Sequence, residues 1–109
     1  MVEELTPEEV KEKVENEEVR VVDIRPEREF ERGHIPGAIN VPMNRLPSEI
    51  DQHDWDGEVV VACPIGKSSV QAAKLIGSYE GVEDAERVAS MEGGYDAWEY
   101  DLESGESEA

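Results

Sequence analysis

The stretch EVVVACPIGKSSVQAAKLI, residues 58–76, predicts a complete β-loop-α unit and thereby decides the fold class. Its first part, residues 58–62, is a nearly continuous apolar and β-branched run, which is typical of a strand covered on both faces. From residue 68 onward, apolar side chains recur at helical spacing, which predicts an amphipathic helix to about residue 79. The residues between these two elements form a tight loop that begins with Cys63.

The rest of the chain repeats this alternation of strands and helices. Thr6 and Glu9 form a candidate capping box around Pro7, which predicts a helix over residues 7–15. Further apolar patterns predict strands over residues 19–24, 38–41 and 85–89, and helices over residues 26–32 and 95–102. Because alternating strands and helices are joined by right-handed crossovers, the sequence predicts an α/β fold in three layers. Its centre is a mainly parallel sheet, flanked by helices on both faces.

The length of 109 residues suffices for one small hydrophobic core. We expect a single domain over residues 1–100 and an acidic, disordered tail over residues 101–109. No stretch approaches the roughly 20 apolar residues of a membrane span, and the first residues lack the basic and apolar blocks of a signal peptide. We therefore expect a cytoplasmic protein that does not bind membranes.

The charge balance excludes one large class of partners. The chain has 28 acidic and 10 basic residues, a formal net charge of −18. Nucleic-acid recognition needs basic patches, so we expect no nucleic-acid partner. We interpret the acidic surface as an adaptation to concentrated salt, because at about 1 M salt the Debye length falls to roughly 3 Å and repulsion between exposed charges is screened.

Cys63, the only cysteine of the chain, follows directly on the predicted strand of residues 58–62. A lone cysteine forms no internal disulfide and no thiolate metal site by itself, so it is either a small buried hydrophobe or a reactive thiol. In open α/β sheets, reactive sites lie beyond the carboxyl ends of strands, where Cys63 stands. Both interpretations stay open at this point.

The loop after Cys63 has the composition of an anion-binding turn. Its backbone N–H groups can point inward, and the following helix adds the positive end of its dipole. This field favours thiolate over thiol and predicts a sulfur that is open to solvent. Gly66 permits a positive φ, and Ser68 and Ser69 can donate hydroxyl hydrogen bonds or cap the helix.

The same loop resembles parts of two phosphate-binding motifs, but it matches neither of them. Gly66-Lys67-Ser68 resembles the end of a P-loop, but the glycine required five positions earlier is Val61. A protein-phosphatase loop needs His before the cysteine and Arg six residues after it, whereas this chain has Ala62 and Ser69. Without that guanidinium, the bidentate grip on a transferring phosphoryl group is missing.

The motifs of the whole chain together resemble those of a rhodanese homology domain. They cover about residues 5–98 and comprise Val22-Asp23-Ile24-Arg25, Glu29-Phe30, the run from Gly33 to Pro42, the loop starting at Cys63, and Glu92 to Trp98. The resemblance implies the rhodanese-like fold and a Cys63 nucleophile that takes up sulfur as a persulfide. It is closest in form to small single-domain thiosulfate sulfurtransferases, because Ser68 stands where the family's loop commonly has Arg.

The resemblance also implies the remaining site residues and partners. Sulfane sulfur would pass from thiosulfate or a similar small anionic donor, through Cys63, to cyanide, a thiol or a protein acceptor. No cofactor and no metal are expected, and the oligomeric state is left open. The expected substrate-binding residues are Pro64, Ile65, Gly66, Lys67, Ser68, Ser69 and Arg25.

Two alternatives to the enzyme remain. One is a binding module with the rhodanese fold but no turnover, and the other is a persulfide carrier in a sulfur-relay pathway. For Asp23, Arg25, Glu29 and His34 we expect a polar network that holds the scaffold, with Arg25 the one most able to reach the mouth of the pocket.

Overall fold

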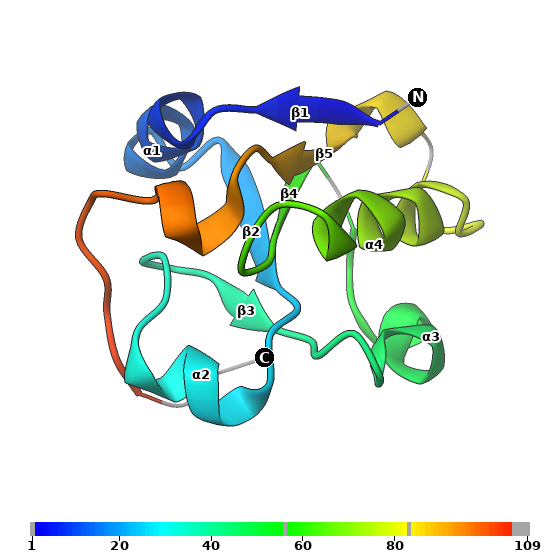
Figure 1. Ribbon diagram of the computed structural model, residues 1–109. Helices are drawn as coiled ribbons and strands as arrows, with labels where there is room; N and C mark the ends of the chain where they lie inside the picture. The colour runs from blue at the N-terminus through cyan, green and yellow to red at the C-terminus, as the bar shows by residue number, and fades with distance from the viewer. Residues whose placement is uncertain (1, 56, 83, 106–109) are drawn as a thin grey trace.

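The computed structural model describes residues 2–55, 57–82 and 84–105. Within these residues, five strands form one sheet in the order β1-β5-β4-β2-β3 (Figure 1). All four pairings between neighbouring strands are parallel. The strands are β1 (Glu3–Leu5), β2 (Val19–Asp23), β3 (Ile39–Asn40), β4 (Glu58–Ala62) and β5 (Val88–Met91).

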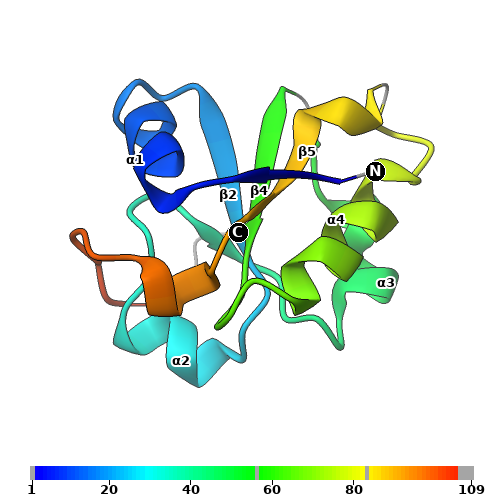
Figure 2. The same ribbon diagram turned by 45° about the horizontal axis from the view of Figure 1, so that its top comes forward.

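Helices cover both faces of this sheet. Figure 2 shows α1 and α2 on one side of the strands and α3 and α4 on the other. The helices are α1 (Pro7–Glu15), α2 (Glu27–Arg32), α3 (Leu46–Glu49) and α4 (Ser68–Gly77), with 3₁₀ turns η1 (Ile50–Gln52), η2 (Ala85–Arg87) and η3 (Gly94–Ala97). The predicted three-layer α/β fold with a parallel sheet is confirmed. None of the helices in the described residues is long and apolar enough to cross a membrane.

The central strand β4 divides the core by the two-residue period of a strand. Val60 and Ala62 pack in the cluster that contains Val10 of α1 and Phe30 of α2. Val59, Val61 and, directly after the strand, Cys63 pack in the opposite cluster, with Ala72, Ala73 and Ile76 of α4. Alternation along the strand therefore sends the cysteine toward the helix that follows it.

The parallel topology brings the loops after β2, β4 and β5 to one edge of the sheet. The N–H of Ile24, after β2, donates to the carbonyl of Ala62 at 3.1 Å. The N–H of Tyr95, after β5, donates to the carbonyl of Cys63 at 2.9 Å. Cys63 thus stands between the two neighbouring loops at the carboxyl edge, as the position of reactive sites in α/β sheets predicts.

Two predicted elements near the C-terminus are wrong in type or boundary. The strand predicted over residues 85–89 begins only at Val88, because Asp84 accepts from the N–H of Glu86 at 3.0 Å and caps a 3₁₀ turn. The helix predicted over residues 95–102 is the short turn η3, and Trp98 is already extended. Two elements, β1 and α3, were not predicted from the sequence, since β1 exposes two glutamates and α3 has four residues.

The acidic tail over residues 101–109, for which we expect disorder, contacts the domain in the part that the structure describes. Glu103 forms an antiparallel bridge with His34 through two backbone hydrogen bonds of 2.8 and 2.9 Å. Its carboxylate also accepts from the N–H of Gly37 at 2.8 Å. Residues 106–109 of that tail lie outside the described residues, and the boundary of the single domain stays a prediction.

Candidate active site

The sulfur of Cys63 is surrounded by hydrogen-bond donors of its own loop. The backbone N–H of Gly66 donates to Sγ at 3.0 Å, and that of Ser69 at 3.3 Å. The hydroxyl oxygen of Ser69 lies 3.2 Å from the same sulfur. The prediction that the turn directs amide hydrogens at the cysteine is confirmed.

Two glycines make this turn possible. Gly66 has a φ of 86°, and a Cβ at this position would lie 2.7 Å from the backbone nitrogen of Gly93. Gly94 has a φ of 60°, and a Cβ there would collide with the carbonyl oxygen of Cys63. Gly94 marks the place where the turn after β5 packs against the Cys63 loop.

Behind the sulfur, two hydroxyl groups meet in the core. Ser69 lies at the start of α4 and Ser90 lies in β5, and both have no exposed surface. Their hydroxyl oxygens are 2.6 Å apart and hydrogen-bonded. Sequence reasoning missed Ser90, although a polar residue inside an otherwise apolar strand was a signal that could have identified it.

The accessibility of the sulfur differs from the expectation. Cys63 has 0 % of its surface exposed, so the predicted solvent-open sulfur is wrong for this conformation. The loop that follows Cys63 is itself exposed. Pro64, Lys67 and Ser68 are exposed, and Ile65 exposes 53 % of its surface to solvent.

Arg25 is held by groups of the scaffold in this structure. Its Nε and Nη2 donate to the carboxylate of Asp23 at 2.8 to 3.1 Å, and Nη2 also donates to the carbonyl of Gly33 at 2.7 Å. Its guanidinium lies 3.6 Å from the centre of the Tyr95 ring. Arg25 therefore joins the loops after β2 and β5, and its role in binding substrate stays a prediction.

The expected polar network is present around Arg25 and, separately, around His34. The carboxylate of Asp23 is fully buried, and its charge is compensated by Arg25. The side chain of Arg25 is 10 % exposed. His34 is stacked on Phe30 at 3.7 Å, and its Nδ1 lies 2.7 Å from the carbonyl oxygen of Phe30. Glu29 has no side-chain hydrogen bond or ion pair among residues 2–55, 57–82 and 84–105. These groups hold the scaffold, as predicted for three of the four.

Tyr95 is the residue in this region with a strongly shifted pKa. Burial raises the pKa of its phenol above the ordinary value of 10.0, and the nearby carboxylate of Asp23 raises it further. Its hydroxyl accepts a hydrogen bond from the N–H of Ile35 at 3.2 Å. The neutral phenol is the form that this environment stabilises.

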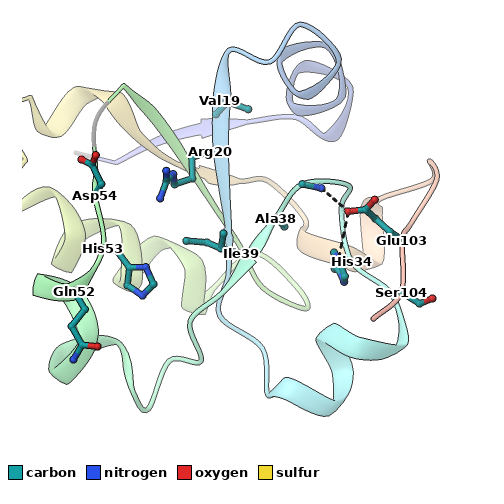
Figure 3. Close-up of a pocket in the computed structure, with 11 residues that line it drawn as sticks. Val19, Arg20, His34, Ala38, Ile39, Gln52, His53, Asp54, Glu103 and Ser104 are labelled. Atoms are coloured by element: carbon teal, nitrogen blue, oxygen red, sulfur yellow. Dashed lines mark hydrogen bonds and ion pairs between the residues drawn. The ribbon is translucent and has the colours of Figure 1, made fainter. Parts of the chain in front are cut away.

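A broad surface groove lies elsewhere on the molecule. Figure 3 shows Arg20, His53 and Ile39 along it, with Glu103 reaching toward His34 at 3.7 Å. None of its lining residues belongs to the loop of residues 63–69. The groove therefore contributes nothing to the chemistry of Cys63.

Comparison with known proteins agrees with this geometry. A model of the rhodanese-like domain family matches residues 6–101. The thiosulfate sulfurtransferase GlpE of Shewanella oneidensis is 41 % identical over 80 residues, which are 73 % of this chain and 75 % of that protein. The putative sulfurtransferase YtwF of Bacillus subtilis is 31 % identical over 99 residues, covering 90 % and 91 % of the two chains. The solved structure of a rhodanese-like domain protein from Staphylococcus aureus has a TM-score of 0.79 at 28 % identity, covering 95 % of this chain and 99 % of its own.

Proposed function

The chain belongs to the rhodanese-like domain family, and from this premise we propose that it is a sulfurtransferase that carries sulfane sulfur on Cys63. One observation carries the proposal. Two backbone N–H groups and one hydroxyl group converge on the only cysteine of the chain, at the carboxyl end of the central strand. An inert cysteine needs no such donors, whereas a nucleophilic thiolate is stabilised by them.

The proposed reaction is a double displacement on sulfur. The Cys63 thiolate attacks the outer sulfur of thiosulfate, a new S–S bond forms, and the old S–S bond breaks. Sulfite leaves with the electron pair of the broken bond, and a Cys63 persulfide remains. Cyanide or an acceptor thiolate then attacks the terminal sulfur, the persulfide bond breaks, and the Cys63 thiolate is restored.

The loop residues take distinct roles in this proposal. The N–H groups of Gly66 and Ser69 stabilise negative charge on the sulfur in both steps, as an oxyanion hole does for oxygen. Lys67 is exposed in the loop and attracts an anionic donor. Because Cys63 is covered, attack also requires the exposed loop of residues 64–68 to move aside.

The same covering of Cys63 is the observation that favours a second candidate, a binding module without turnover. A sulfur with no exposed surface is what a module that no longer exchanges sulfur would retain. The hydrogen-bond donors around Cys63 favour the enzyme, because a packing role would not require them. A persulfide carrier would share the covalent intermediate and differ in its donor and acceptor.

The test is the mass of the intact protein after incubation with thiosulfate, combined with thiocyanate formation from thiosulfate and cyanide. We expect the wild type to gain the mass of one sulfur atom and to release thiocyanate. Cys63→Ser should do neither. Ser78→Ala, which removes an exposed hydroxyl at the end of α4, is the control and should behave as the wild type.

The outcomes separate the three candidates. A wild type that gains no sulfur from thiosulfate or from any other sulfane donor supports the binding module. A protein that gains sulfur only from a protein persulfide and yields no thiocyanate supports the carrier. Sulfur uptake that persists in Cys63→Ser would exclude Cys63 as the nucleophile.

A further inference from the structure

We propose that Ser90 is a positioning residue, which holds the hydroxyl of Ser69 as a hydrogen-bond donor to the Cys63 thiolate. This inference rests on the proposed function of Cys63 as a thiolate nucleophile. It concerns three side chains from three elements: the end of β4, the start of α4 and the strand β5. All three residues have no exposed surface.

The direction of each hydrogen bond follows from the number of hydrogens. A serine hydroxyl has one hydrogen to donate and lone pairs to accept. When Ser69 donates its hydrogen to the Cys63 thiolate, across 3.2 Å, no hydrogen is left for the contact of 2.6 Å with Ser90. Ser90 must then be the donor in that contact, and the chain of donation runs from Ser90 through Ser69 to the sulfur.

When the sulfur is protonated, this series of hydrogen bonds from Ser90 to Cys63 is incomplete. A Cys63 thiol donates to Ser69, and Ser69 in turn donates to Ser90. The hydrogen of the Ser90 hydroxyl then has no acceptor, because no other side-chain hydrogen bond of Ser90 exists among residues 2–55, 57–82 and 84–105. A buried hydroxyl hydrogen without an acceptor is costly, and a thiol that instead accepts from Ser69 has its own S–H hydrogen unpaired. This series of hydrogen bonds is therefore complete only when the sulfur is a thiolate.

Charged groups on the neighbouring elements do not replace this effect. Lys67 in the loop and Glu92 after β5 are exposed, and Asp23 after β2 is paired with Arg25. In the described part of the chain, the polar contacts of the sulfur are the N–H groups of Gly66 and Ser69 and the Ser69 hydroxyl. The hydroxyl of Ser69 is thus the side-chain donor through which Ser90 can act.

The test is a double-mutant cycle with Ser69→Ala, Ser90→Ala and the combined variant. The readout is the thiolate absorbance near 240 nm as a function of pH, with the absorbance of the Cys63→Ser protein subtracted. This measurement needs neither substrate nor access to the sulfur. We expect Ser90→Ala to move the midpoint upward by about half a pH unit and Ser69→Ala by roughly one. In the Ser69→Ala background, Ser90→Ala should cause no further shift.

This last comparison separates positioning from mere packing. Loosening of β5 against α4 would act in either background, so an equal shift with and without Ser69 would overturn the proposal. An unchanged midpoint in Ser90→Ala would overturn it as well. Ser78→Ala is the control for loss of a hydroxyl and should leave the midpoint unchanged.

A second pair of variants covers the case in which Ser90→Ala does not fold. Ser90→Thr keeps the hydroxyl, and Ser90→Val has the shape of Thr with a methyl group in place of that hydroxyl. Only Ser90→Val should therefore raise the midpoint, and equal midpoints in this pair would overturn the proposal.

The measurement is also independent of sulfur transfer. A protein that gains no sulfur from any donor but shows the predicted coupling between Ser69 and Ser90 refutes the proposed function alone. An active enzyme without this coupling refutes the role of Ser90 alone.

Discussion

At the scale of single residues, the candidate site depends on backbone atoms more than on side chains. The N–H of Gly66 points at the sulfur because its φ of 86° turns the chain there, a conformation that residues with a Cβ rarely adopt. The nearby chain at Gly93 leaves no space for a Cβ. The backbone of Gly66 is therefore a direct part of the proposed chemistry.

We predict that Gly66→Ala impairs both stability and sulfur transfer. The left-handed backbone and the contact with Gly93 should together cost roughly 2–5 kcal/mol of unfolding free energy. Displacement of the N–H from the sulfur should lower the rate of thiocyanate formation at least about tenfold. Urea unfolding and the cyanolysis assay measure the two effects.

Gly37→Ala is the matched control for this variant. Gly37 has a similar φ of 83°, but no atom lies within 4 Å of the position of its Cβ. Its substitution should cost only the backbone strain, about 1–2 kcal/mol, and should leave the rate unchanged. Equal rates in the two variants would contradict the role given to Gly66.

At the scale of elements, the short turn η3 connects loops that are far apart in the sequence. The backbone of η3 donates to the carbonyls of Cys63 and Pro64, at 2.9 and 3.0 Å. The ring of Tyr95 lies beneath Arg25, and its hydroxyl accepts from Ile35. The turn after β5 thus fixes the Cys63 loop against the loop after β2.

We predict that this connection makes stability sensitive to high pH. The pKa of Tyr95 is raised in the folded state, so its contribution to stability is complete below the ordinary value of 10.0. It declines as the pH rises above 10 toward the higher folded value, because only the unfolded phenol ionises readily there. Tyr95→Phe should be destabilised by about 1–2 kcal/mol at neutral pH, since the buried N–H of Ile35 loses its acceptor.

The difference between the wild type and Tyr95→Phe should therefore shrink above pH 10. Urea unfolding from pH 7 to pH 11 measures it. The control is Tyr79→Phe, because the Tyr79 hydroxyl has no hydrogen bond in the described part of the chain. A constant difference between the wild type and Tyr95→Phe over this range would refute the linkage.

At the scale of the whole molecule, the acidic surface is the dominant feature. The net charge of −18 belongs to a domain whose Cα atoms have a radius of gyration of 12.3 Å. The ion pairs of Lys11, Arg45 and Arg87 are local and exposed, and such pairs contribute little. Repulsion between the remaining carboxylates therefore opposes the compact state wherever salt does not screen it.

We predict that the melting temperature rises with salt. Between dilute buffer and about 1 M potassium chloride, screening should raise it by roughly 5 °C or more, because for a domain of this size about 1 kcal/mol corresponds to 4–8 °C. Thermal unfolding followed by circular dichroism measures the change. A melting temperature that does not rise would refute the halophilic interpretation.

A charge variant is the control for this experiment. Glu4, Glu12 and Glu31 are exposed, and their carboxylates have no ion pair within the described residues. Replacing the three by glutamine should raise the melting temperature in dilute buffer and reduce the gain from salt. If salt raised the melting temperature of this variant as much as that of the wild type, the effect of salt would have a cause other than carboxylate repulsion.

The sequence by itself determined the features that depend on local pattern. The valine-rich run of β4 and the alternation of strands and helices predicted the parallel sheet. The capping box of Thr6 and Glu9 predicted the start of α1, because both partners lie within one turn. The place of Cys63 after a buried strand, with a glycine three residues on, predicted amide donors at its sulfur.

Only the tertiary structure decided the features that depend on contacts between distant segments. The direction of Arg25 is set by the carbonyl of Gly33 and the ring of Tyr95, together with the neighbouring carboxylate of Asp23. The sulfur is buried by the packing of the core around it. The contact of Ser69 with Ser90, which are 21 residues apart, arises because α4 packs on β5. Local patterns hold no information on which side chains long-range pairing brings together, and this is why the sequence identified the cysteine but not the hydroxyl behind it.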